Sequence, residues 1–142
     1  MPMDISNFNQ EHSRFVNGCM SNSHFENIML AGTVIHNVDG SRMKISNANL
    51  SDLEIEGAQL GGAFIHNIGM PPEGHPLYDP NAQMRPVRFE DCNLSGMRFE
   101  NCNLQGMRIN DCNLSGVELT DCNIKGMKIN GVAIEELLTR GS

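Results

Sequence analysis

The chain has 142 residues, five cysteines, no tryptophan and a formal net charge of −7 at pH 7. This length fits one domain, and the acidic balance argues against direct nucleic-acid binding. No apolar run is long enough to cross a membrane. We therefore predict one domain over residues 1–142, with no membrane or nucleic-acid partner.

The N-terminal segment from Met1 to Arg14 is polar and carries two acidic residues. It lacks the basic start and apolar centre of a secretory leader. A cytoplasmic location follows as a prediction, and in a reducing compartment the cysteines are expected to remain free thiols.

An apolar residue recurs at every fifth position from Phe15 to Ile65, with Gly40 as the one exception. The remaining centres of this repeat are Met20, Phe25, Leu30, Ile35, Ile45, Leu50, Ile55 and Leu60. A five-residue period gives no stripe on a helix, which turns by about 100° per residue. It also alternates faces on a strand. The period therefore indicates a solenoid rather than either regular element.

A tighter copy of the repeat covers residues 87–134. Its centres are Phe89, Leu94, Phe99, Leu104, Ile109, Leu114, Leu119, Ile124, Ile129 and Ile134. The position two before each centre is small or apolar, and the position two after is Asn, Asp or Gly except at Arg42 and Glu136. Such residues tolerate left-handed backbone. Each pentad therefore predicts a short side and a corner, and four pentads close a coil of about twenty residues, with coils paired as parallel strands about 4.8 Å apart.

Pentads such as Cys92-Asn93-Leu94-Ser95-Gly96 and Ala48-Asn49-Leu50-Ser51-Asp52 resemble the A(D/N)LXX repeats of the pentapeptide repeat family. The resemblance covers about residues 13–69 and 87–136. It implies an all-β fold: a right-handed quadrilateral parallel β-helix of about five coils with one extruded loop.

The coil predicts which side chains form the core. The central residues Phe89, Leu94, Phe99 and Leu104 are expected to be almost fully buried, so Leu104→Ala would cost about 2–5 kcal/mol. Four cysteines are expected to point inward beside them: Cys92, Cys102, Cys112 and Cys122. Cys19 falls at an outward position and is either a reactive thiol or an inert one. The cysteine spacing does not match a zinc site, and no metal or cofactor is predicted.

Residues 71–86 interrupt the repeat and contain five prolines, which remove donors that a strand needs. We predict a loop that projects from the coil. Leu77 and Tyr78 lie at its middle. They either contact a protein partner or fold back onto a coil face and anchor the loop.

No catalytic or phosphate-binding motif is present, so an enzyme is not expected. On the twenty-residue coil, His36 should stack over Glu56, and His66 should join the column of Glu26 and Ser46. The asparagine pairs Asn93–Asn113 and Asn103–Asn123 are expected to bond between coils. A basic column of three residues is a candidate for partner binding: Arg88, Arg108 and Lys128.

The favoured hypothesis is a non-enzymatic protein-interaction scaffold with an unidentified protein partner. The family resemblance also implies an alternative, a DNA-mimicking protein that binds DNA gyrase or another topoisomerase. Residues 87–134 hold six acidic and five basic residues, so they lack the rows of acids that such mimicry needs.

The segment 135–142 is predicted to cap the coil. Ile134 to Leu138 should form a short turn or helix with Leu137 or Leu138 on the end of the core. The family resemblance also implies a homodimer through this C-terminal end. Gly141 and Ser142 receive no role.

Overall fold

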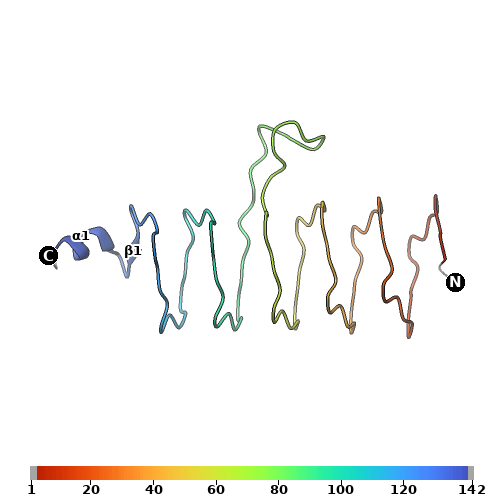
Figure 1. The fold of residues 1–142 in the computed structure, drawn as a ribbon, viewed down its shortest axis with the longest axis horizontal. Coiled ribbons are helices and arrows are strands. Elements are labelled where there is room, and N and C mark those ends of the chain that lie inside the picture. Colours follow the sequence, from red (N-terminus) through yellow and green to blue (C-terminus); the bar gives the residue numbers. More distant parts are fainter. Residues whose placement is uncertain (1–2, 141–142) are drawn as a thin grey trace. The chain divides into compact units, whose positions relative to one another are not determined.

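The structure is a computed structural model that describes residues 3–140, and the side chains of residues 3–139. The chain divides into two compact units, Met1–Ile65 and His66–Ser142. Among residues 3–140 the regular elements are β1 (Lys128–Ile129), β2 (Val132–Ala133) and α1 (Ile134–Arg140), all in the second unit (Figure 1). Gly141 and Ser142, the end of the predicted cap, lie outside the described residues.

A left-handed corner follows each centre of the repeat, from Phe15 to Ile65 and from Phe89 to Ile129. The residue two positions after the centre has a φ between 51° at Asn47 and 78° at Gly131. Even Arg42, which departs from the Asn, Asp or Gly pattern, has a φ of 63°. The predicted corners are therefore confirmed in both units.

Two kinds of corner alternate along the chain. In the first kind, the carbonyl of the centre accepts the N–H three residues later, as Leu94 does from Met97 at 3.1 Å. With a positive φ at the third residue, here 74° at Gly96, this is the geometry of a type II turn. The asparagine before the centre adds a second bond, because Asn93 Oδ1 accepts the Ser95 N–H at 3.1 Å.

The asparagine columns therefore differ from the sequence prediction. The side-chain oxygens of Asn93, Asn103, Asn113 and Asn123 all accept the N–H two residues ahead, at 3.0–3.1 Å. Among the described residues, none of these oxygens bonds to the next coil. The amide is used within its own turn because the N–H two residues ahead is the nearest unpaired donor.

At four corners of the second kind, all in the second unit, a thiol closes the turn. Asp91 has a φ of 53°, and the Cys92 Sγ–H donates to the carbonyl of Glu90 at 3.1 Å. The same bond recurs at Cys102, Cys112 and Cys122, at 3.1–3.3 Å. All four thiols are exposed, so the prediction that they pack as small core residues is wrong. They stabilise corners instead.

The parallel β-helix is not confirmed. Within residues 3–140 the pairing of strands is that of β1 with β2, and it is antiparallel, with Lys128 opposite Ala133 and Ile129 opposite Val132. The backbone hydrogen bonds of the coils close turns rather than join one coil to the next. Within residues 3–140 of this structure, no parallel ladder joins successive coils.

The predicted core residues are exposed for the same reason. Phe89, Leu94, Phe99 and Leu104 expose 53, 39, 52 and 40% of their surface. Coils that are not joined by a ladder do not close over the side chains between them. The burial prediction for these four residues is wrong, and the cost predicted for Leu104→Ala, which assumed full burial, does not follow from this structure.

The chain ends in a hairpin and a helix. Asn130 and Gly131 both have positive φ, 50° and 78°, as a type I′ turn between β1 and β2 requires. α1 then begins at Ile134, whose N–H bonds the carbonyl of Met127 at 3.0 Å. Glu135 and Glu136 occupy its first turn, where negative charge is favourable.

A helix was among the predicted forms of this segment, but its packing differs from the prediction. Leu137 and Leu138 are exposed, whereas Met127, Ala133 and Ile134 are half-buried. The hairpin reverses the chain before the helix starts, so the start of α1 contacts the last pentad. The two leucines are carried away from it.

Residues 71–86 contain turns and no helix or strand, and they project from the line of the coils in the second unit (Figure 1). Three backbone bonds close these turns: His75 to Pro72 at 3.0 Å, Tyr78 to His75 at 2.9 Å and Ala82 to Asp79 at 3.2 Å.

Candidate interaction surface

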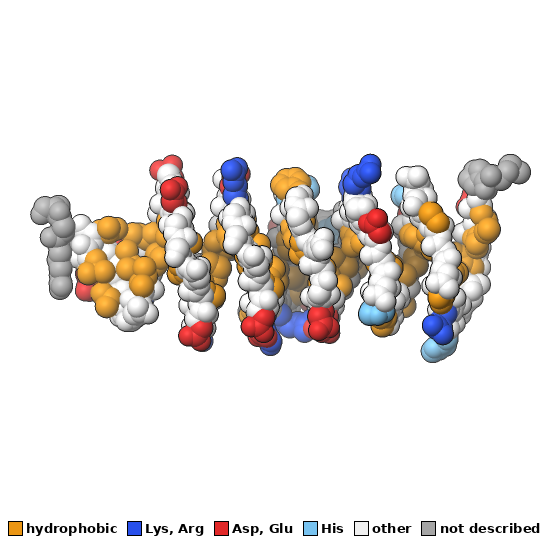
Figure 2. All heavy atoms as spheres, turned by 90° about the horizontal axis from the view of Figure 1, so that it is seen from below, with side chains coloured by type: hydrophobic (Ala, Val, Ile, Leu, Met, Phe, Trp, Pro, Cys, Tyr) orange, Lys and Arg blue, Asp and Glu red, His pale blue; other side chains and the backbone are white. Residues whose placement is uncertain are grey.

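An apolar hollow of about 300 Å³ lies within the second unit. Its lining consists of centres and of residues two before a centre: Met107, Ile109, Leu114, Val117, Leu119, Met127 and Ile129. Met107 and Met127 are one predicted coil apart, as are Ile109 and Ile129. Equivalent positions of successive pentads therefore line the same hollow, although the hollow is open to solvent. Figure 2 shows hydrophobic side chains between the coils and many of the charged side chains at the coil edges.

The basic residues lie on the outer side of these segments. Arg108 stands between Met107 and Ile109, both of which face the hollow. Lys128 lies in the same way between Met127 and Ile129, which also line the hollow. Neighbouring residues of an extended segment point to opposite faces. Arg108 and Lys128 therefore face away from the hollow, and both are exposed.

Arg88, the first member of the basic column, is paired within its own segment. Its Nη2 lies 2.6 Å from Oε1 of Glu90, and both side chains are largely exposed. No ion pair within the described residues involves Arg108 or Lys128. Arg108 and Lys128, two of the three residues of the basic column, are therefore available to a partner.

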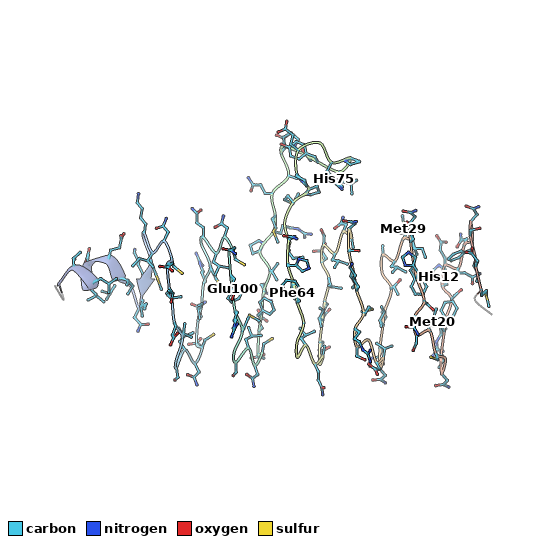
Figure 3. The ribbon with its side chains drawn as sticks, in the orientation of Figure 1. His12, Met20, Met29, Phe64, His75 and Glu100 are labelled. Atoms are coloured by element: carbon cyan, nitrogen blue, oxygen red, sulfur yellow. The ribbon has the colours of Figure 1, made fainter. Side chains whose placement is uncertain are left out.

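Leu77 and Tyr78 lie on the projecting loop, on which Figure 3 labels His75. The Leu77 N–H donates to Nδ1 of His75 at 3.1 Å, and Tyr78 is held by its backbone bond to His75. Leu77 exposes 69% of its surface and Tyr78 41%. The loop is therefore braced by its own turns, and Leu77 is not folded against a coil face.

The first unit has a polar hollow of about 270 Å³, lined by His24, Phe25, Glu26, Asn27, Ser46 and Asn47. Glu26 and Ser46 line it together, as the predicted column requires. His66, predicted to extend this column, belongs to the other unit. The histidine–carboxylate contact here is between His24 Nε2 and Glu26 Oε2 at 3.5 Å, and no ion pair joins His36 to Glu56 among the described residues.

Four positions of the first unit carry a different residue where the turns of the second unit have asparagine: Cys19, Met29, Asp39 and Gln59. The side chains of Cys19 and Asp39 bond to the serine two residues ahead. Cys19 Sγ lies 3.2 Å from Ser21 Oγ, and the hydrogen bonds from the Ser21 side chain and backbone lower the Cys19 pKa. Asp39 accepts the hydroxyl and N–H of Ser41 at 2.6 and 3.0 Å, and these bonds lower its pKa. In both cases the ionised side chain, the Cys19 thiolate or the Asp39 carboxylate, is stabilised because it accepts hydrogen bonds from the serine two residues ahead.

Within the described residues, no three His, Cys, Asp or Glu side chains gather as metal ligands. The same part of the chain has no helix with the length and apolar character needed to cross a bilayer.

The family model for a pentapeptide repeat region matches residues 80–138. This stretch is a pentapeptide repeat region. No curated protein and no solved structure matches the chain. The repeat region contains Arg88, Arg108, Lys128 and the hollow beside them, and it begins within the projecting loop. Residues 15–65 lie outside the match, but their corners have the same left-handed backbone.

The sequence analysis missed that the corners alternate. The sequence does distinguish the two kinds of corner between Glu90 and Gly116. Corners of the first kind read Asn-Leu-X-Gly, and corners of the second kind read Asp or Asn followed by Cys. The repeat of the turn bonds is thus ten residues, twice the period of the apolar centres.

Proposed function

We propose that the chain is a non-enzymatic protein-interaction scaffold, and that residues 71–86 contact a protein partner. The observation that carries this proposal is the exposure of Leu77 on a loop whose turns are already closed by hydrogen bonds. A loop that is ordered before binding loses less conformational entropy in the complex. Tyr78 adds an aromatic side chain of the kind enriched at binding hot spots.

The test is capture of proteins from the native cell by the immobilised full chain, followed by mass spectrometry. The partner is the protein that wild type retains, that the double variant Leu77→Ala/Tyr78→Ala loses and that Gln83→Ala retains. Gln83 is an exposed residue of the same loop and serves as the control. Equal capture by the wild type and the double variant would refute the loop as the contact site.

We further propose that the repeat forms a right-handed quadrilateral β-helix. The shared hollow supports this, because closing the coils to a ladder spacing of about 4.8 Å would bury its apolar lining. In such a coil the amide protons of residues twenty apart, as in Ile109 and Ile129, lie within reach of nuclear Overhauser contacts. Their absence in an assigned spectrum of the full chain would refute the ladder.

The same proposal includes a cytoplasmic location and no direct contact with nucleic acid or membrane. All five cysteines are free thiols, as is usual in a reducing compartment, and the net charge of −7 opposes binding to phosphates. DNA mimicry toward a topoisomerase remains the alternative function. It is favoured by the net charge alone.

A further inference from the structure

The pentad Met107 to Asp111 carries charges of both signs that have no ion-pair partner. One predicted coil earlier, Arg88 is neutralised by Glu90 at 2.6 Å. Asn110 stands where that glutamate would be. Within the described residues neither Arg108 nor Asp111 takes part in an ion pair. The sequence thus leaves one cation and one anion exposed on the same segment.

Both charges lie on the outer side of the coil. Met107 and Ile109 line the apolar hollow, so Arg108 between them faces outward. Asp111 forms the corner that follows, with a φ of 53°, and it is exposed. Lys128 occupies the position of Arg108 one coil later.

In the β-helix of the proposed function, two columns of opposite charge would run side by side along the charged face, which is made of residues 87–91, 107–111 and 127–131. The basic column holds Arg88, Arg108 and Lys128. The acidic column, three positions further along each pentad, holds Asp91 and Asp111.

We propose that the charged face binds the charged face of a second copy of this chain, with a two-fold axis parallel to the columns. This proposal rests on the β-helix of the proposed function. A two-fold axis along the columns exchanges them, so the basic column of each copy meets the acidic column of the other. A two-fold axis across the columns in the plane of contact would place basic against basic. Charge thus selects the parallel arrangement.

In this dimer Arg108 pairs with Asp111 of the second copy, and symmetry makes the same pair twice. Arg88 is already bonded to Glu90, so the central segment carries most of the selectivity. Exposed ion pairs are weak singly and are screened by salt. The dimer is therefore expected to depend on protein concentration and to dissociate as salt increases.

The experiment uses the full chain and two charge reversals, Arg108→Glu and Asp111→Lys, with self-association followed by sedimentation velocity. Each single variant is expected to dimerise about tenfold more weakly than wild type, because like charges then face each other. An equimolar mixture of the two restores dimers, since one pair then joins Glu at position 108 to Lys at position 111 and the other pair keeps Arg108 with Asp111. Arg98→Glu, the same change on another side of the coil, is the control and retains the wild-type dissociation constant.

Recovery in the mixture also shows that both variants fold. The proposal is overturned if wild type remains monomeric at about 1 mM, or if the single variants dimerise as strongly as wild type, as a dimer through the C-terminal end would. It is also overturned if the mixture associates no better than its components. A monomeric chain that still captures its partner through Leu77 and Tyr78 would refute this dimer while leaving the proposed function intact.

Discussion

Asn113 Oδ1 accepts two hydrogen bonds from Ser115, one from the N–H at 3.0 Å and one from the hydroxyl at 2.7 Å. The turn that follows is closed by the Val117 N–H, which donates to the carbonyl of Leu114 at 3.1 Å. The carboxamide and the backbone therefore hold one corner together. This explains why asparagine precedes the centre and glycine follows it by two positions in these pentads.

Replacing Asn113 tests the contribution of that side chain. Asn113→Ala is expected to lower the free energy of unfolding by about 1 kcal/mol, because the Ser115 N–H loses its acceptor. Asn113→Asp retains an acceptor oxygen and should be closer to wild type. Urea denaturation measures both. Ser115→Ala, which removes only the hydroxyl bond, should have a smaller effect than Asn113→Ala, and the reverse order would contradict this account.

Gly106 tests the backbone of the corners. Its φ is 76°, and a Cβ added there would meet no atom within 4 Å. Gly106→Ala is therefore expected to destabilise through backbone conformation alone, by about 1–2 kcal/mol. Gly69→Ala is the control, since Gly69 has equal space and no positive φ. Equal thermal unfolding of the two variants would show that the corner tolerates a side chain.

The corners could be predicted from sequence because they depend on local chemistry. Asn47 and Gly131 differ in side chain, but each stands two residues after an apolar centre and each adopts a left-handed backbone. The hairpin was equally local and was missed. The Asn130-Gly131 dipeptide is a strong type I′ signal, but it also fits the regular pentad Met-Lys-Ile-Asn-Gly, so the five-residue period concealed it.

Burial could not be predicted in the same way, because it depends on how successive coils meet. The side chain of Leu104 becomes buried only if a neighbouring coil covers it. No residue within its own pentad determines whether the neighbouring coil does so. The same holds for Asn93, which can bond to its own turn or to the next coil and takes the nearer partner, Ser95. The exposure of Leu77 could be anticipated from the sequence, because it depends on the proline-rich loop alone.

Arg42 occupies a corner without the side chain that favours one. Its φ of 63° is unfavourable for most residues, whereas asparagine and glycine adopt it readily. Arg42→Asn is expected to raise the free energy of unfolding by about 0.5–1 kcal/mol. Lys44→Asn removes the same charge outside the corner and is the control. A gain in melting temperature for both variants would attribute the effect to charge rather than to the backbone.

Cys19 is expected to be the most reactive thiol near neutral pH. The Ser21 hydrogen bonds lower its pKa, so a larger fraction is thiolate, the species that attacks alkylating agents. The rate at which Cys19 is labelled should level off once its own thiol is fully ionised. Labelling by iodoacetamide over a pH series, read by peptide mass spectrometry, measures this. Ser21→Ala removes the side-chain bond and should shift the Cys19 profile to higher pH, and an unchanged profile would contradict the assigned cause.

DNA gyrase offers the sharpest test between the two functions. A DNA mimic needs exposed faces that are uniformly acidic, but the repeat region places Arg108 and Lys128 on an outer face and pairs Arg88 with Glu90. These cations oppose a surface built for phosphates, so we expect no strong inhibition of supercoiling by the cognate gyrase. The variant Arg108→Glu/Lys128→Glu makes that column acidic and serves as the comparison. If wild type inhibits at about micromolar concentration, with an affinity near −8 kcal/mol, DNA mimicry replaces the general scaffold as the proposed function. If only the variant gains inhibition, the basic column is what prevents mimicry in this chain.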